Sequence, residues 1–289
     1  MTLNEARTIL AKELKNVYDS NELKNIIDLV LVYITNMSRS EQVKNKLAYL
    51  TCTQLENLDA ITERLKKNEP VQYVLGEAWF AGMKFKVNKN VLIPRPETEE
   101  LVDWIVKEIN TLQGSPFGQC SIIDIGTGSG CIPITLKRKI PDADIYAIDV
   151  CSEALFTATE NAIELNAEVN FILLDFLAEG KWNELGQYDI IVSNPPYVKQ
   201  SEIKKMHERV TEFEPHLALF VPDEDALLFY KKLSAFALKH LNKGGSLFVE
   251  INEALGDAVV KLFQSTGFTN VELKKDLQGK DRMIRAILQ

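Results

Sequence analysis

The chain has 289 residues, of which 46% are hydrophobic and 26% are charged, and its formal net charge at pH 7 is −8. This composition is ordinary for a globular protein, and the length allows two domains, or one large domain with a smaller one attached. The acidic balance argues against a broad electrostatic footprint on nucleic acid, and no apolar run is long enough to cross a membrane. We therefore expect a protein or small-molecule substrate, with no direct nucleic-acid contact and no membrane partner.

Cysteine and histidine usage gives no sign of a disulfide framework or a metal site. Cys52, Cys120, Cys131 and Cys151 show no CxxC spacing and are predicted to be small core residues in a reducing compartment. The N-terminus has charged residues within an amphipathic pattern instead of a signal-peptide core, so we expect a cytoplasmic location. The histidines lack metal-ligand spacing, and no metal is assigned.

Residues 1–70 are predicted to form a helical domain, because apolar residues recur there at helical spacing. Asp19 with Glu22, and Thr53 with Glu56, have the spacing of capping boxes and are expected to open two of the helices. This region could serve substrate recognition or packing alone, and the sequence favours neither role.

Residues 71–95 are predicted to connect the helical domain to the rest of the chain through a β-hairpin that turns at Ala81-Gly82. Arg95 lies between two prolines and is held in extended geometry, while Pro96 is well placed to start a helix. Arg95 and Glu97 therefore lie on a rigid connector. A charge on a connector is usually only solvated, but the fixed geometry makes both residues candidates for contact with the substrate.

Residues 96–289 are predicted to form an α/β domain. Within it, a buried strand over residues 121–125 leads into Gly126-Thr127-Gly128-Ser129-Gly130, and a helix follows. Glycines at alternate positions let the backbone approach a ligand closely at the N-terminus of a helix. The GxGxG spacing departs from the GxGxxG of dinucleotide-binding folds, which counts against NAD.

Two further predicted strands end in side chains that suit a nucleoside. The strand over residues 145–148 ends at Asp149, whose carboxylate could accept both hydroxyls of a ribose or, alternatively, cap the next helix. The strand over residues 169–174 ends at Asp175-Phe176, an acceptor and an aromatic face for adenine. Three successive strands with such ends predict a nucleoside site across the carboxyl edge of a sheet.

The β-branched run over residues 190–193 ends at Asn194-Pro195-Pro196-Tyr197. Neither proline has an N–H group, so this turn offers carbonyl oxygens, and Asn194 adds a carboxamide oxygen. Two such acceptors suit a planar –NH2 group, and Tyr197 could form an aromatic wall beside it. The alternative is a proline-rich turn in which Asn194 caps its own loop.

The later segment over residues 213–219 is predicted to be extended.

Together these motifs resemble the peptide chain release factor glutamine methyltransferases of the HemK/PrmC family. The matching segments are Ile93-Pro94-Arg95-Pro96-Glu97-Thr98, Asp124-Ile125-Gly126-Thr127-Gly128-Ser129-Gly130, Asn194-Pro195-Pro196-Tyr197, Phe213-Glu214-Pro215 and Asp276-Leu277-Gln278-Gly279-Lys280-Asp281-Arg282. The glycine loop is shared by many methyltransferases, whereas the Asn-Pro-Pro-Tyr motif marks enzymes that methylate amino or amide nitrogen. Its combination with the first segment narrows the resemblance to glutamine methylation.

The resemblance implies a seven-stranded, mostly parallel, Rossmann-like methyltransferase sheet whose final strand is antiparallel, preceded by an N-terminal helical domain. It implies S-adenosylmethionine as methyl donor, with residues 126–130 at its methionine end, Asp149 at its ribose, and Asp175 and Phe176 at its adenine. Asn194 would contact both this cofactor and the substrate. The implied substrate is the glutamine of the Gly-Gly-Gln loop of class 1 release factors, and the implied role is support of translation termination.

We hypothesise that Asn194 and the Pro195 carbonyl hold the two N–H groups of the substrate amide, with Pro196 and Tyr197 completing the catalytic turn. An N-methylated amide cation is a strong acid, so no strong base is needed. One rival is a nucleic-acid amino methyltransferase, which uses a similar motif on a flipped base. A second is a binding module that retains the fold without chemistry. A third is a glutamine methyltransferase that acts on a ribosomal protein.

Overall fold

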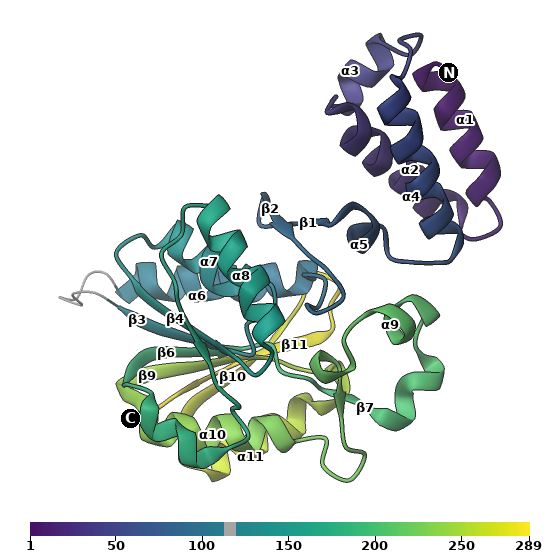
Figure 1. The fold of residues 1–289 in the computed structure, drawn as a ribbon. Coiled ribbons are helices and arrows are strands. Elements are labelled where there is room, and N and C mark those ends of the chain that lie inside the picture. The colour runs from purple at the N-terminus through teal and green to yellow at the C-terminus, as the bar shows by residue number, and fades with distance from the viewer. Residues whose placement is uncertain (113–119) are drawn as a thin grey trace. The chain divides into compact units, whose positions relative to one another are not determined.

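The computed structural model describes residues 1–112 and 120–289, which form two compact units (Figure 1). The smaller unit consists of Met1–Glu77 together with His207–Phe213, and the larger unit of Ala78–Met206 and Glu214–Gln289. The three-part division of the chain at residues 70 and 95 stays a prediction.

The smaller unit is built from helices. These are α1 (Leu3–Leu14), α2 (Ser20–Thr35), α3 (Arg39–Lys44), α4 (Cys52–Lys66), α5 (Val71–Leu75) and α9 (Glu208–Phe213). The apolar faces of α1, α2, α4 and α5 meet in one core that is dominated by leucine, isoleucine and valine. Arg209 of α9 lies over the Tyr18 ring at 4.3 Å and pairs with Glu22, so α9 is tied to the same bundle.

The predicted Asp19–Glu22 box is confirmed only in its first half: the Asp19 side chain accepts the backbone N–H groups of residues 21 and 22, whereas the Glu22 carboxylate pairs with Arg209. The predicted Thr53–Glu56 box is wrong. Thr51 has the extended backbone that a cap requires, and it forms a capping box with Gln54 two residues earlier than expected. A second correction concerns the cysteines, since Cys52 is exposed and is not a core residue.

The larger unit contains a seven-stranded sheet in the order β10-β11-β9-β6-β3-β4-β5. The strands are β3 (Ser121–Ile125), β4 (Asp144–Asp149), β5 (Asn170–Leu173), β6 (Tyr188–Ser193), β9 (Leu241–Glu250), β10 (Thr269–Lys275) and β11 (Asp281–Ile287). The neighbouring strands β5, β4, β3, β6 and β9 pair in parallel, whereas β11 pairs antiparallel with both β9 and β10. This confirms the mostly parallel sheet with an antiparallel final strand.

Helices cover both faces of this sheet, which explains why its central strands are almost continuously apolar. One face carries α6 (Pro96–Leu112), α7 (Cys131–Lys139) and α8 (Ser152–Glu164), and the other carries α10 (Leu228–His240) and α11 (Gly256–Ser265) (Figure 1). Alternate residues of β3 enter different cores, with Ile122 on the α6–α7 side and Ile123 on the α10–α11 side.

Shorter elements complete the larger unit. The predicted hairpin is present as β1 (Glu77–Phe80) and β2 (Met83–Lys86), and its Ala81-Gly82 turn has positive φ at both residues. After β6, the strand β7 (Val198–Lys199) pairs with β8 (Phe220–Val221).

The extended segment predicted over residues 213–219 is wrong in its second half. His216–Ala218 forms a 3-10 turn, closed by a hydrogen bond from the Ala218 N–H to the Pro215 carbonyl. Proline fixes its own φ and restricts the residue before it, but it leaves the residues after it free to turn.

The Asn161 side chain joins three parts of the larger unit. Its Oδ1 accepts the Lys86 N–H at 2.6 Å, and its Nδ2 donates to the carbonyls of Lys86 at 3.0 Å and Ser129 at 2.9 Å. Asn161→Ala would leave the buried Ser129 carbonyl and the partly buried Lys86 groups unpaired, so we expect the free energy of unfolding to fall by about 3 kcal/mol. Chemical denaturation measures this change, with Asn183→Ala at an exposed position as the control. Equal losses in the two variants would contradict the expectation.

Candidate active site

A cavity of about 440 Å³ lies where the parallel strands of the large sheet end. Its volume falls in the range usual for sites that bind a small molecule or cofactor. Its lining includes Ile125–Ser129 at the end of β3, Ile148–Cys151 at the end of β4, Leu174–Leu177 after β5 and Ser193–Pro196 at the end of β6. The predicted strand-end residues are therefore brought together in one place.

The glycine loop forms one wall of this cavity. Gly126 and Gly128 have φ of 79° and 56°, and a Cβ added at either would meet open space. Gly130, also at φ 79°, differs because a Cβ there would meet Ile134 Cδ1 at 2.9 Å and Ala158 Cβ at 3.1 Å. The first two glycines thus leave room beside the cavity, whereas the third allows α7 to pack closely on α8.

Asp149 lies at the end of β4 and lines the cavity. One carboxylate oxygen accepts the Gly128 N–H at 2.8 Å, and the other accepts the Cys151 N–H at 2.9 Å. These bonds hold the carboxylate between the glycine loop and the start of α8. A carboxylate offers about four acceptor positions, so acceptor capacity for two hydroxyl groups remains.

Asp124, at the end of β3, was part of the glycine-loop motif but was not predicted as a site residue. Its carboxylate is fully buried, and neither oxygen has a hydrogen-bond partner among the described residues. Burial raises the pKa of Asp124 to about 7. The sequence signal was an acidic residue inside an apolar strand, two positions before the first glycine of the loop.

The residues after β5 form another part of the cavity wall. Asp175 accepts the Leu177 N–H at 2.9 Å, which turns the chain after β5. Phe176 lines the cavity but is largely buried, with its ring stacked on Trp182 at 5.4 Å. Only part of this ring therefore remains available to a ligand.

Asn194 lines the cavity and belongs to a chain of hydrogen bonds that enters the protein interior. Its Nδ2 donates to Thr98 Oγ1 at 3.1 Å, and Thr98 Oγ1 donates to Glu250 Oε2 at 2.6 Å. The Tyr197 hydroxyl donates to the other oxygen of Glu250 at 3.2 Å. Thr98 also lines the cavity, whereas Tyr197 is not among the described residues of its lining. Sequence reasoning did not identify Thr98 or Glu250 as site residues.

Glu250 ends β9 and is fully buried. Burial raises its pKa, while the hydrogen bond from Thr98, the charge of Arg282 and the hydrogen bond from Tyr197 oppose this shift. The Tyr230 hydroxyl donates to the backbone carbonyl of Glu250 at 3.3 Å. Glu250 is therefore a buried acceptor with two hydroxyl donors on its carboxylate.

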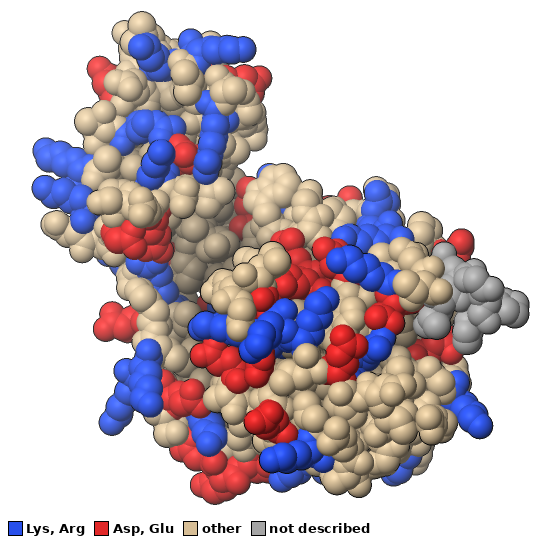
Figure 2. Space-filling view, turned by 180° about the vertical axis from the view of Figure 1, so that it is seen from behind, with Lys and Arg blue, Asp and Glu red and all other residues tan. Residues whose placement is uncertain are grey.

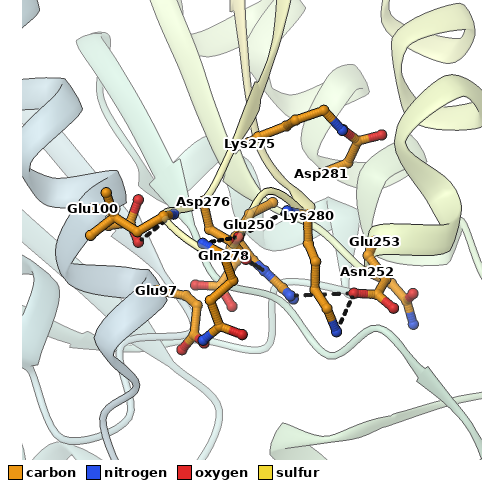
Figure 3. A network of polar contacts seen from close by, with 12 residues as sticks. Glu97, Glu100, Glu250, Asn252, Glu253, Lys275, Asp276, Gln278, Lys280 and Asp281 are labelled. Atoms are coloured by element: carbon orange, nitrogen blue, oxygen red, sulfur yellow. Dashed lines mark hydrogen bonds and ion pairs between the residues drawn. The ribbon is translucent and has the colours of Figure 1, made fainter.

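The two connector charges lie in different surroundings. Arg95 lines the cavity and forms a 2.6 Å ion pair with the buried Glu214. Glu97 instead accepts from Gln278 Nε2 at 3.4 Å, in the turn between β10 and β11 (Figure 3). Glu97 is not among the described residues that line the cavity.

The turn between β10 and β11 is held by polar contacts on both sides (Figure 3). Asp276 accepts the N–H groups of Gln278 and Lys280 at 2.9 Å each, and it pairs with Arg282 at 3.1 Å. Glu100 of α6 accepts the Leu277 N–H at 3.2 Å. The segment over residues 276–282, one of those that resemble the family, thus forms a braced turn, and it ends at Arg282, next to the residue of β11 that pairs with Glu250.

The surface shows no single dominant charge on the face drawn in Figure 2, where lysine and arginine are interspersed with aspartate and glutamate. Within residues 1–112 and 120–289, no cluster of histidine, cysteine, aspartate and glutamate has the arrangement of a metal site. The helices in the same ranges are all too short or too polar to span a bilayer.

Comparison with known proteins first gives the class. A family model described as Methyltransferase small domain matches residues 109–217. The fold resembles the hMettl16 catalytic domain, with a TM-score of 0.53, 15% identity and coverage of 86% of this chain and 85% of that one. It also resembles the RsmC 16S rRNA methyltransferase of Thermus thermophilus, with a TM-score of 0.50, 15% identity and coverage of 74% and 50%. The fold is therefore that of the methyltransferase class.

The particular family follows from closer relatives. The PrmC N-terminal domain model matches residues 5–76. A release factor glutamine methyltransferase of Flavobacterium psychrophilum is 43% identical, with 99% of each chain covered. Another, from Bacteroides thetaiotaomicron, is 41% identical, with 98% of this chain and 99% of that protein covered. This chain belongs to the release factor glutamine methyltransferase family, as the motifs predicted.

Proposed function

We propose that this enzyme transfers a methyl group from S-adenosylmethionine to the side-chain amide nitrogen of the Gly-Gly-Gln glutamine in class 1 release factors. By this modification it would support translation termination in the cytoplasm. The observation that carries the proposal is that Asn194 and Pro195 lie in the same cavity as the glycine loop and Asp149. Membership of the family indicates the substrate, and the cavity offers adjoining places for a nucleoside and an amide.

The residues of the cavity fit S-adenosylmethionine, which supplies an electrophilic methyl group on a sulfonium. The loop over residues 126–130 would hold its methionine end, where Gly126 and Gly128 leave open space. Asp149 would accept the ribose hydroxyls, and Asp175 with the accessible part of Phe176 would hold the adenine. The buried, unpartnered carboxylate of Asp124 places negative charge next to the loop, which favours a cationic ligand.

The amide nitrogen of glutamine is a poor nucleophile because its lone pair is delocalised into the carbonyl. Asn194 Nδ2 is already bound to Thr98, so the Asn194 Oδ1 remains as an acceptor for one substrate N–H. The Pro195 carbonyl would accept the other. Fixing both N–H groups orients the nitrogen and stabilises the positive charge that develops on it. The chain then needs no strong base, because the methylated amide cation loses its proton readily to water.

Roles for the remaining predicted site residues follow from their positions. Arg95 lines the cavity, so it would contact the release-factor loop there, whereas Glu97 would act from the side of the braced turn. Pro196 keeps the turn free of competing N–H donors. Tyr197 would support the turn through its hydroxyl on Glu250 instead of serving only as an aromatic wall.

Methyl transfer to a purified class 1 release factor tests the proposal directly. With S-adenosylmethionine present, we expect intact and peptide mass spectrometry to find one added methyl group, located on the glutamine of the Gly-Gly-Gln loop. A release factor with that glutamine replaced by alanine serves as the control and should gain none. Methylation of RNA or of a ribosomal protein in place of the release factor would overturn the proposed substrate.

Asn194→Ala removes one of the two acceptors for the substrate amide. The loss of one preorganised polar contact commonly slows a reaction about 100-fold or more, so we expect the turnover number to fall by at least that factor. Binding of S-adenosylmethionine, followed by calorimetry, should persist because the glycine loop and Asp149 are unchanged. An Asn194→Ala enzyme with normal turnover would show that this amide does not hold the substrate.

Binding of S-adenosylmethionine should depend on pH through Asp124. Burial raises the pKa of this carboxyl to about 7, and a cationic ligand beside it favours the ionised form. Affinity should therefore weaken as pH falls through 7. If the bound form is fully ionised, affinity at pH 6 should be about tenfold lower than its value well above pH 7. Calorimetry at several pH values measures this slope, and Asp124→Asn should remove the contribution. The same slope in both proteins would assign it to another group.

A further inference from the structure

We propose that Thr98 and Glu250 are positioning residues, which turn the Asn194 carboxamide so that its oxygen, and not its –NH2 group, faces the substrate. This inference rests on the proposed function and adds the question of how the enzyme selects one of two possible amide orientations. The two ends of a carboxamide have nearly the same shape, so packing alone does not distinguish them. Only a hydrogen-bond partner of fixed polarity can do so.

Glu250 supplies that fixed polarity. As a carboxylate it only accepts hydrogen bonds, and it receives one from Thr98 at 2.6 Å and one from Tyr197 at 3.2 Å. The single proton of the Thr98 hydroxyl is therefore committed to Glu250. Thr98 Oγ1 can then only accept from Asn194, which requires the Asn194 Nδ2 to point at it, at 3.1 Å.

The opposite arrangement would prevent Asn194 from binding the substrate amide. If Thr98 donated to Asn194, the Asn194 oxygen would turn inward and its –NH2 group would face the cavity. A donor facing the –NH2 group of the substrate glutamine repels it instead of holding it. The direction of two hydrogen bonds inside the protein thus decides whether the cavity can bind an amide nitrogen.

Burial raises the pKa of Glu250, and the hydrogen bonds from Thr98 and Tyr197 oppose that shift and favour the accepting carboxylate. Arg282 lies on β11, which pairs with β9 at Glu250, and its charge favours the ionised carboxylate. Arg282 is itself held by Asp276 at 3.1 Å, within the braced turn. Glu97 contributes the opposing like charge. On the other side, Pro96 begins α6, which sets Thr98 in the first helical turn, facing both Asn194 and Glu250.

The test compares two substitutions of Thr98, one without and one with a hydroxyl, and a control substitution at another threonine. Thr98→Val has nearly the same shape without the hydroxyl, and Thr98→Ser keeps it. We expect the turnover number with a class 1 release factor to fall about 10- to 100-fold in Thr98→Val and to stay within about threefold in Thr98→Ser. Affinity for S-adenosylmethionine should be unchanged in both. Thr157→Val, at another buried threonine, controls for the loss of a hydroxyl from the core and should keep normal turnover.

Glu250→Gln tests the polarity itself. Glutamine can present either an acceptor or a donor to Thr98, so both orientations of Asn194 become possible and turnover should fall. Normal turnover in Thr98→Val, or equal losses in Thr98→Val and Thr98→Ser, would overturn the proposal.

A second readout needs no substrate. Nuclear magnetic resonance of protein labelled with 15N at asparagine reports the Asn194 side-chain amide, which is assigned by its disappearance in Asn194→Ala. Its protons should show close contacts to the side chain at position 98 in the wild type and in Thr98→Ser, and these contacts should weaken in Glu250→Gln, where both orientations become populated. Contacts of undiminished intensity in Glu250→Gln would overturn the proposed orientation. If no release factor is methylated but these contacts behave as expected, the proposed function fails and the positioning role stands.

Discussion

The common direction of five neighbouring strands is the constraint on which the site depends. Because β5, β4, β3, β6 and β9 run in parallel, their carboxyl ends meet at one edge of the sheet. Each of these ends contributes something different: an acceptor, a carboxylate, a glycine loop, an amide and a buried acid. Helices cover both faces of the sheet, so the cavity and its polar groups lie at the edge where these strands end.

The parts of this arrangement that were predictable from sequence depend on local patterns. The glycine loop, the strand before Asn194 and the helix that begins at Pro96 are each specified within a few residues. The Thr98–Glu250 contact was not predictable in this way. Its partners lie 152 residues apart, and they meet only because α6 packs on the sheet beside β9. A local pattern carries no information about such a pairing.

Two buried acids at this edge have contrasting surroundings. Glu250 receives two hydroxyl donors and lies near Arg282, whereas Asp124 has no partner among the described residues. A satisfied buried acid holds its neighbours in one arrangement, and an unsatisfied one raises the free energy of the protein until a ligand compensates for it. The first therefore suits positioning, whereas the second would favour a cation bound beside the glycine loop.

The path of the backbone bears on how such enzymes can be recombined. The smaller unit takes α9 from the middle of the sequence, so the chain passes between the two units three times, after residues 77, 206 and 213. Arg209 carries from α9 the cation–π contact to Tyr18 and the ion pair with Glu22. A chimera that exchanged only the first 77 residues between relatives would pair a foreign bundle with the resident α9. Transplanting the bundle as one unit therefore requires the exchange of two separate segments, with α9 moved together with the N-terminal helices.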